Sequence, residues 1–252
     1  MDSKIPVFVL NLDARKERWN TFAEHYRATL RSDRSLRSLV SETPERLSAT
    51  ALPEDPARGC CTSHLRAIQL AEDRNYEQVL VFEDDGRWAE NAGVKLKGVL
   101  DELYAQVSGS AQVVFFGAGT AKKIGFQSLH LGVLLRDGVI TSTHAMLYRK
   151  VPESSGTGFS KLIDALQRAI APESWCPHID LAISEHFGGT RQVFVAIPYV
   201  AKFVECGTTD VRTGKDITDD FEQLQKTEER LVQAMSIAYV KRQTTQIQQP
   251  GH

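Results

Sequence analysis

The stretch Val79-Leu80-Val81-Phe82-Glu83-Asp84-Asp85-Gly86 decides the fold, because a short apolar run passes directly into three consecutive carboxylates. Four adjacent apolar residues are typical of a strand buried on both faces, as in a parallel sheet covered by helices on each side. In open α/β sheets, ligands bind at the carboxyl ends of such strands. The stretch therefore predicts a buried strand that ends at a polar site.

Similar apolar runs recur along the chain and alternate with segments of helical periodicity. Further strands are expected at residues 5–12, 112–116 and 193–197, with helices near 94–107, 159–170 and 177–187 and one beginning near residue 63. Strands separated by helices indicate crossover connections. The predicted fold class is α/β, with a Rossmann-like, mostly parallel central sheet flanked by helices.

Other segments are less regular. Residues 27–58 are rich in Arg, Ser and Pro and are interpreted as a loop region with a short strand at 46–51, and residues 129–135 and 139–147 as a strand pair turning at 137–138. An amphipathic helix is expected over 219–240. With no linker or repeat, residues 1–240 are predicted to form a single domain, and residues 241–252 a polar, disordered tail.

Composition narrows the function classes. The 252 residues are 42% hydrophobic and 25% charged with a formal net charge of -2, which is typical of a soluble protein and gives no overall attraction to nucleic acid. The arginines between residues 27 and 46 form the clearest local basic patch. No signal peptide or membrane-spanning run of about 18 apolar residues is present. We expect a cytoplasmic protein, whose contact with a membrane, if any, is peripheral to its inner face.

The four cysteines support the same location. Their spacing is not that of a paired metal site such as C-x-x-C, so they are interpreted as reduced thiols in a reducing compartment. They are Cys60, Cys61, Cys176 and Cys206.

The three carboxylates repel one another, and a divalent cation would relieve that repulsion. Oxygen ligands favour Mn²⁺ or Mg²⁺. Alternation along an extended segment puts Glu83 and Asp85 on one side and Asp84 on the other. Either the pair or Asp84 alone faces the metal; we favour Glu83 and Asp85. A solvated acidic turn is the alternative interpretation.

Two basic or polar groups accompany the early strands. Arg15 and Arg18 follow the strand that ends near Asn11, where guanidinium groups could hold a pyrophosphate; a solvated helix face is the alternative. Ser63 and His64 lie at an expected helix start, where Ser63 could cap the helix and His64 could bind phosphate or a carboxylate. A structural histidine is the alternative there.

Asp180 lies three residues after Pro177, in the first turn of an expected helix. The helix dipole stabilises an ionised carboxylate at that position. The side chain is a candidate general base or metal ligand. On its own, the position is equally that of an ordinary acid at the start of a helix.

The order of these motifs resembles glycosyltransferase family 25, which holds lipooligosaccharide and collagen galactosyltransferases. The resemblance spans residues 5–205 and rests on an apolar strand with a nearby Arg, a Gly-Cys-x-x-Ser-His block, Glu-Asp-Asp after a strand, a strand ending in Gly, a Thr-x-Ala strand and Pro-x-x-Asp. In this chain those motifs fall at 7–18, 59–64, 83–85, 113–117, 143–148 and 177–180. Residues 27–58 and 117–140 depart from the family pattern.

The resemblance implies a GT-A type glycosyltransferase fold and a metal-dependent, inverting enzyme. It would move galactose or glucose from a UDP-sugar to a hydroxyl of a glycan or protein acceptor, as in polysaccharide biosynthesis. Glu83 and Asp85 would hold Mn²⁺ or Mg²⁺, and Asp180 would be the base. The nucleotide would lie near Asn11, Arg15, Arg18, Ser63, His64 and Asp84.

Two other classes remain as alternatives. A non-catalytic glycan- or partner-binding member of the fold would not need to keep three carboxylates. A metal-dependent nucleotidyltransferase usually has a Gly-rich phosphate loop after the first strand, where this chain has Asn11-Leu12-Asp13-Ala14. A phosphotransferase is disfavoured because the P-loop motif is missing from the sequence.

Overall fold

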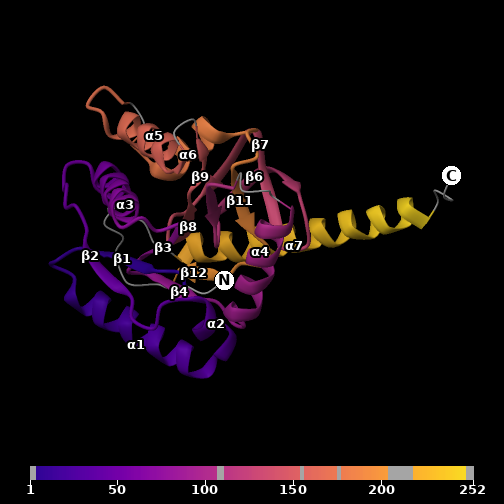
Figure 1. Ribbon diagram of the computed structural model, residues 1–252, viewed down its shortest axis with the longest axis horizontal. Coiled ribbons are helices and arrows are strands. Elements are labelled where there is room, and N and C mark those ends of the chain that lie inside the picture. Colours follow the sequence, from indigo (N-terminus) through magenta and orange to yellow (C-terminus); the bar gives the residue numbers. More distant parts are fainter. Residues whose placement is uncertain (1–3, 107–110, 154–155, 175–176, 204–217, 248–252) are drawn as a thin grey trace.

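An eight-stranded sheet forms the centre of the protein, as seen in the computed structural model, which describes residues 4–106, 111–153, 156–174, 177–203 and 218–247. The strand order is β2-β1-β3-β8-β5-β11-β7-β6 (Figure 1). The strands are β1 (Val7–Asn11), β2 (Glu45–Ser48), β3 (Gln78–Glu83), β5 (Val113–Phe115), β6 (Thr120–Phe126), β7 (Leu131–Thr141), β8 (Ala145–Arg149) and β11 (Val193–Ala196).

Six of the eight strands run in one direction. β2, β1 and β3 pair in parallel, and so do β5 and β11, whereas β8 is antiparallel to both β3 and β5. β7 is antiparallel to its neighbours β11 and β6. The expected α/β class, with its Rossmann-like, mostly parallel sheet flanked by helices, is confirmed.

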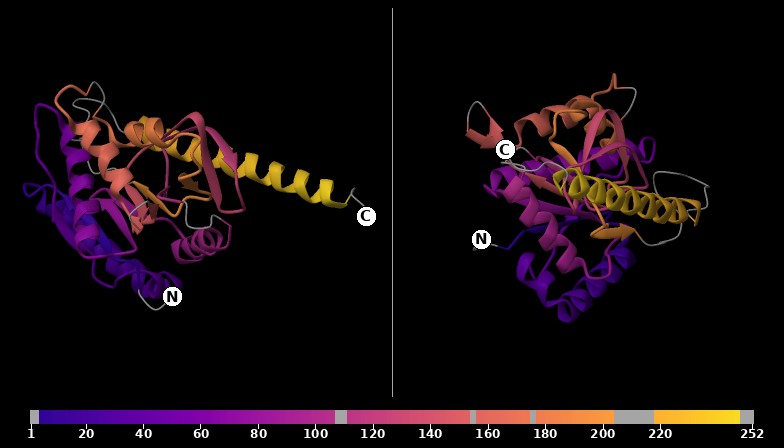
Figure 2. Two further views of the ribbon diagram at one scale, coloured as in Figure 1. Left: turned by 45° about the horizontal axis from the view of Figure 1, so that its top comes forward. Right: turned by 90° about the vertical axis from the view of Figure 1, so that its right-hand side faces the viewer.

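Helices cover both faces of the sheet (Figures 1 and 2). One core cluster joins a sheet face to α3 (Pro56–Asp73), α5 (Ser160–Ile170) and α6 (Ile179–Phe187). The other joins the opposite face to α1 (Lys16–Ser32), α2 (Arg34–Leu39) and α4 (Ala92–Gln106). Two small antiparallel pairs complete the fold: β4 (Gly86–Trp88) with β12 (Ala201–Phe203), and β9 (Val151–Glu153) with β10 (Gly156–Gly158).

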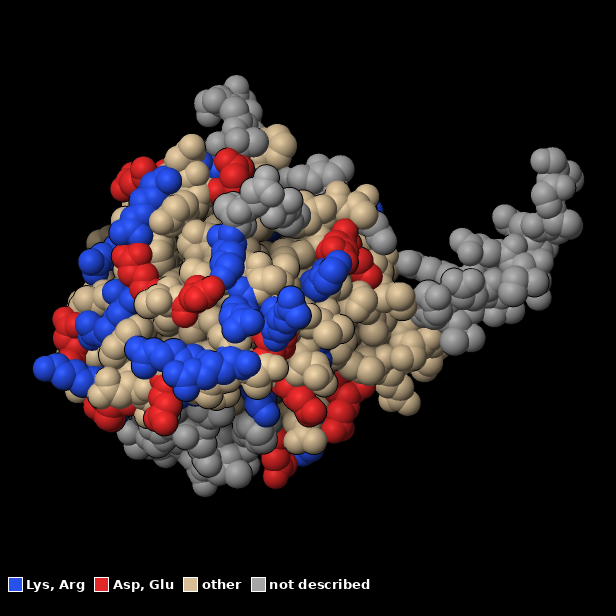
Figure 3. Space-filling view, turned by 60° about the horizontal axis from the view of Figure 1, so that its bottom comes forward, with Lys and Arg blue, Asp and Glu red and all other residues tan. Residues whose placement is uncertain are grey.

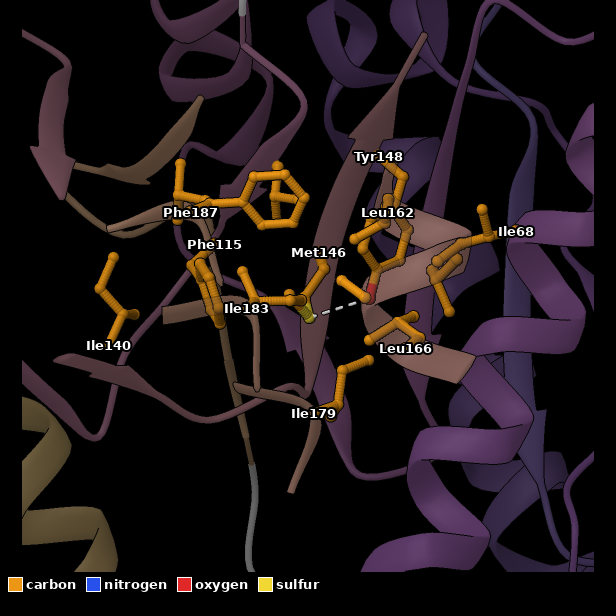
Figure 4. Packing of buried hydrophobic residues seen from close by; sticks show 14 of the residues in the cluster. Ile68, Phe115, Ile140, Met146, Tyr148, Leu162, Leu166, Ile179, Ile183 and Phe187 are labelled. Atoms are coloured by element: carbon orange, nitrogen blue, oxygen red, sulfur yellow. Dashed lines mark hydrogen bonds between the residues drawn. The ribbon is translucent and has the colours of Figure 1, made fainter. Parts of the chain in front are cut away.

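The core on the α3 side fixes the helices that carry candidate site residues. Leu162 and Leu166 of α5 and Ile179 and Ile183 of α6 lie close to Met146 in the sheet (Figure 4). Burial of such side chains stabilises the fold by roughly 1.5–3 kcal/mol each. The amino-terminal turn of α6, which holds Asp180, is thereby anchored to the sheet.

The segment 27–58 was wrongly predicted to be mainly loop. α1 continues to Ser32, and α2 follows after Asp33, whose side chain caps it by accepting a hydrogen bond from the Leu36 N–H at 2.9 Å. Arginine is a good helix former, so an Arg-rich segment with few apolar residues can still be helical. The predicted short strand exists as β2, which begins one residue earlier and ends three residues earlier than expected.

The predicted strand pair at 129–147 is also wrong. β7 passes through residues 137–138 as one strand paired with β6, and β8 is a separate strand. Asp137 has a φ of 54°, and the register between β6 and β7 shifts opposite it, so these residues form a bulge instead of a hairpin turn.

The carboxyl-terminal helix α7 (Thr218–Ile247) packs over β6 through Leu231 and then extends beyond the body of the protein (Figures 1 and 2). The helix includes residues 241–247, which were expected to be disordered; residues 248–252 lie outside the described residues. Within the described part of the chain, no helix has the length and apolar character needed to cross a membrane. Cys60 and Cys61 are free thiols, and the expectation for Cys176 and Cys206 falls on residues outside the described ones.

The arginines of the basic patch lie on α1 and α2, except for Arg46, which lies on β2 and is half-buried. Arg27, Arg31, Arg34 and Arg37 are exposed. Basic and acidic side chains alternate over the side of the molecule seen in Figure 3. Side chains of both charges thus share this side of the molecule, in keeping with the small net charge.

Candidate active site

The candidate site lies where β1 and β3 end side by side. These strands are parallel neighbours in a register that pairs Leu10 with Glu83. The residues that follow, Asn11 on β1 and Asp84 after β3, therefore come together at the same edge of the sheet. The chain then turns through Asp85 and Gly86 into β4.

Asp84 is held by one amide and one guanidinium group. Asn11 Nδ2 donates to Asp84 Oδ2 at 2.6 Å, and Arg18 Nη1 lies 3.3 Å from Oδ1. The Arg18 and Asp84 side chains are each only 10% exposed. Burial raises the pKa of Asp84, while Asn11 and Arg18 oppose that change. The Arg18–Asp84 pair thus keeps a guanidinium at the end of β1.

Glu83 turns toward α3 instead. Its Oε1 lies 3.5 Å from Cys60 Sγ and 3.4 Å from His64 Nε2, and Thr143 Oγ1 also donates to it. The relevant atoms of Cys60, His64 and Glu83 all lie within 4.8 Å of one another. Burial favours a higher pKa for Glu83, but hydrogen bonding and the charge of His64 outweigh it and lower the pKa to about 2.

Asp85 is the least satisfied of the three carboxylates. Its Oδ1 is buried and has no hydrogen-bond partner among the described residues. Burial, followed by the charges of Glu83 and Asp84, raises the pKa of Asp85 to about 7. A buried acceptor that lacks a donor and lies beside two other carboxylates fits a divalent cation.

A second layer of polar groups surrounds Asn11. Arg46 Nε donates to Asn11 Oδ1 at 2.7 Å, and Arg46 Nη2 contacts Asp13 Oδ1 at 2.7 Å. Arg46 also lines a cavity of about 380 Å³ between β2 and α3. The other residues lining it are Leu47, Ser48, Ser63, Arg66, Gln69, Leu70 and Asp73. Arg15 immediately precedes α1 and is half-buried.

The prediction that Ser63 caps a helix is wrong. α3 begins at Pro56, and its cap is Asp55, which accepts from the Arg58 N–H at 3.1 Å. Ser63 is instead buried inside the helix, where its hydroxyl donates to Gly59 O at 2.7 Å and accepts from Thr50 N at 2.8 Å. Ser63 therefore ties α3 to the segment that follows β2.

Asp180 is connected to the carboxylates through the segment between β7 and β8. Its Oδ2 accepts from the Ser142 N–H at 2.9 Å, and its Oδ1 from the Leu181 N–H at 2.8 Å. The next residue after Ser142 is Thr143, which donates to Glu83. The Asp180 carboxylate thus binds the residue that is next to a direct partner of Glu83.

The structure brings most of the predicted residues together. Asn11, Arg18 and Asp84 are in direct contact, and His64 contacts Glu83. Cys60, Thr143 and Arg46 were not among the predicted site residues. Cys60 and His64 are four residues apart, a spacing that places both on one face of a helix, and this signal was available in the sequence.

Comparisons with known proteins give no family. The chain matches no protein-family model and no curated protein. Solved structures of similar arrangement include a glycosyltransferase involved in glycosylation of the major capsid of PBCV-1, with a TM-score of 0.48, 10% identity and coverage of 88% of this chain and 98% of that one. At this identity and TM-score, the similarity does not identify the function of this chain.

Two further solved structures have lower TM-scores. Mannose-1-phosphate geranyltransferase from Thermus thermophilus has a TM-score of 0.37, 14% identity and coverage of 77% of this chain and 73% of that one. The 4-diphosphocytidyl-2C-methyl-D-erythritolsynthase of Anaerococcus prevotii has a TM-score of 0.36, 10% identity and coverage of 91% and 99%.

Proposed function

We propose that this chain is a metal-dependent glycosyltransferase that moves a sugar, galactose or glucose, from a UDP-sugar to a hydroxyl group of a glycan or protein. The proposal includes the GT-A type of family 25 and inversion at the anomeric carbon, both of which come from the motif resemblance. A cytoplasmic location is part of the same proposal.

The observation that carries the proposal is Asp85. A buried carboxylate oxygen that no donor among the described residues reaches, at the carboxyl end of a central strand, is costly unless a cation joins it. Asp85 would hold Mn²⁺ or Mg²⁺ together with Glu83, whose contacts to Cys60, His64 and Thr143 all fall on Oε1. When bound, the cation would neutralise the diphosphate that leaves with the nucleotide.

The donor side of the site would be formed by the end of β1. Asn11 and Asp84 fix the position of Arg18, and Arg46 lies on the other side of Asn11. Guanidinium groups in such positions bind diphosphate oxygens through paired N–H groups. Arg15 completes the set of groups proposed to surround the nucleotide, while Ser63 and His64, both buried on α3, support the donor pocket from beneath.

Asp180 is proposed as the general base. It would accept the proton of the acceptor hydroxyl while that oxygen attacks the anomeric carbon from the side opposite the nucleotide. Its two backbone donors, Ser142 and Leu181, hold the carboxylate in place. Each oxygen retains a further lone pair for the acceptor proton.

A panel of UDP-sugars tests the proposal. Purified protein with Mn²⁺ is expected to release UDP from one or two sugars, and EDTA or Asp85→Asn should abolish release without unfolding the protein. Binding of UDP-sugars with no release of UDP would indicate a non-catalytic member of the fold. Release of pyrophosphate from UTP in the presence of sugar 1-phosphates would identify a nucleotidyltransferase instead.

A further inference from the structure

We propose that Cys60, His64 and Glu83 Oε1 form a zinc site, which differs in its ligands from the cation site proposed at Asp85 but shares Glu83 with it. This inference does not depend on the proposed function. Cys60 and His64 project from the same face of α3, and Glu83 meets them from the end of β3. The ligands therefore come from two rigid elements of the core.

The distances fit tetrahedral zinc. With zinc bonds of about 2.3 Å to sulfur and about 2.0–2.2 Å to nitrogen and oxygen, tetrahedral angles put sulfur about 3.5 Å and nitrogen about 3.4 Å from the oxygen. The observed separations from Glu83 Oε1 are 3.5 Å to Cys60 Sγ and 3.4 Å to His64 Nε2. Two of the three separations thus match a shared ion, and the third, between the ligand atoms of Cys60 and His64, lies within 4.8 Å.

Tyr148 supplies the outer partner that zinc-bound histidines usually have. Its hydroxyl lies 2.8 Å from His64 Nδ1 and donates to Met146 Sδ at 3.2 Å (Figure 4 shows the contact with Met146). If the hydroxyl proton is on the Met146 side, His64 Nδ1 carries a hydrogen and Nε2 presents its lone pair to Glu83 and Cys60. Without the ion, a protonated His64 can donate from Nε2 to Glu83, and zinc takes the place of that proton, which is released to solvent.

The donor set selects the metal. A thiolate, an imidazole and a carboxylate suit zinc better than the harder Mn²⁺ or Mg²⁺. Binding deprotonates the Cys60 thiol and releases that proton to solvent, so that sulfur forms the metal bond. The Glu83 side chain is 28% exposed, whereas His64 is fully buried. Zinc therefore enters beside Glu83, and water takes the fourth position.

The test is direct metal binding by the full chain, freed of metal and without nucleotide or sugar. Zinc titrated against a chromogenic chelator should bind in a 1:1 ratio. Cobalt at the same site should give a thiolate-to-cobalt charge-transfer band and the intense visible absorption of a tetrahedral ion. A wild-type cobalt complex without the thiolate band would overturn the proposal, whatever the variants do.

Variants then assign the ligands. Cys60→Ser and His64→Gln should weaken zinc binding by more than the roughly 10–100-fold that loss of an outer partner costs, and Tyr148→Phe by about that amount. Cys61→Ala is the matched control, because Cys61 is the adjacent thiol, buried but outside the cluster. Equal zinc affinities for the Cys60 and Cys61 variants would contradict the assignment. Circular dichroism identifies any variant that has not folded. The cobalt spectrum of the wild-type protein tests the zinc site without relying on any variant.

Discussion

Asn11 lies between Asp84 and Arg46, with its amide nitrogen donating to Asp84 Oδ2 at 2.6 Å and its amide oxygen accepting from Arg46 Nε at 2.7 Å. One buried amide thus connects an anion at the end of β3 with a cation on β2. The orientation of the amide is fixed by these opposite charges. Residue 11 has to offer a donor and an acceptor at once, which few side chains can do.

Asn11→Ala should lower the free energy of unfolding by about 1–3 kcal/mol, because a buried carboxylate loses its donor. Urea unfolding followed by circular dichroism measures the change. Asn20→Ala is the matched control, since Asn20 is exposed on α1 and should stay within about 0.5 kcal/mol of wild type. Equal losses in both variants would mean that the Asn11 contacts contribute nothing special.

Arg18→Ala should raise the Michaelis constant for the donor roughly tenfold, with a smaller effect on kcat. The loss corresponds to one charge-assisted hydrogen bond of about 1.5 kcal/mol to the diphosphate. Steady-state kinetics with the donor found in the UDP-sugar screen provides the measurement. Arg27→Ala, an exposed arginine on the same helix, should leave both constants unchanged. If kcat falls and the Michaelis constant does not change, Arg18 acts on the reacting atoms and not in donor binding.

Asp85→Asn should change how stability depends on pH. The pKa of Asp85 is about 7 when folded, against an ordinary value of 3.8, so its ionisation opposes folding progressively as pH rises between these values. The variant lacks this penalty. Its stability advantage over wild type should therefore grow from pH 4 to pH 7, by about 1–4 kcal/mol at about 1.4 kcal/mol per pKa unit.

Urea titrations of both proteins in EDTA across that range measure the Asp85 effect. Mn²⁺ should reduce the difference at pH 7, because a bound cation compensates the ionised carboxylate of the wild type. If the difference in unfolding free energy between the two proteins stays constant from pH 4 to pH 7, the pKa of Asp85 is not raised by its surroundings.

Asp180→Asn should lower kcat by about 10²–10⁴, the range of a general base, while donor binding persists. The amide retains one acceptor oxygen for the two backbone donors Ser142 and Leu181, so stability should also fall by about 1–3 kcal/mol. Turnover, UDP affinity and urea unfolding are measured together. Glu185→Gln, exposed on the same helix, is the control. If stability falls but turnover is normal, the role of Asp180 is only to hold residues 142–144 in place.

The sequence predicted the central strands because β1, β3, β5 and β11 are buried on both faces and read as short apolar runs. β6 was missed because Thr120–Phe126 lies at the sheet edge and mixes lysines with apolar residues, without a clear period. The predicted turn at Asp137-Gly138 was also wrong. That dipeptide is typical of turns, but pairing with β6 keeps it within β7. Local sequence does not report such long-range pairing.

The candidate site was foreseen where it follows from strand ends, as for Asn11 and Asp84. Partners that depend on side-chain direction were harder to predict. Strand alternation indicated that Glu83 and Asp84 point to opposite sides, and their separate partners agree with this. The alternation could not show that Cys60 contacts Glu83. That contact depends on how α3 packs across the sheet, which the pattern of one strand does not determine.

Residues 142–144 have a consequence for the evolution and engineering of this protein. Loops ordinarily accept inserted residues, but this connection is held at each of its positions: Ser142 N–H by Asp180, Thr143 by Glu83, and His144 O by the Glu83 N–H at 3.1 Å. Ser142 also adopts a φ of 95°, so the path of the chain is set by these contacts. A single inserted residue would break at least one of them. Homologues should accordingly vary here by substitution and keep the length of this connection constant.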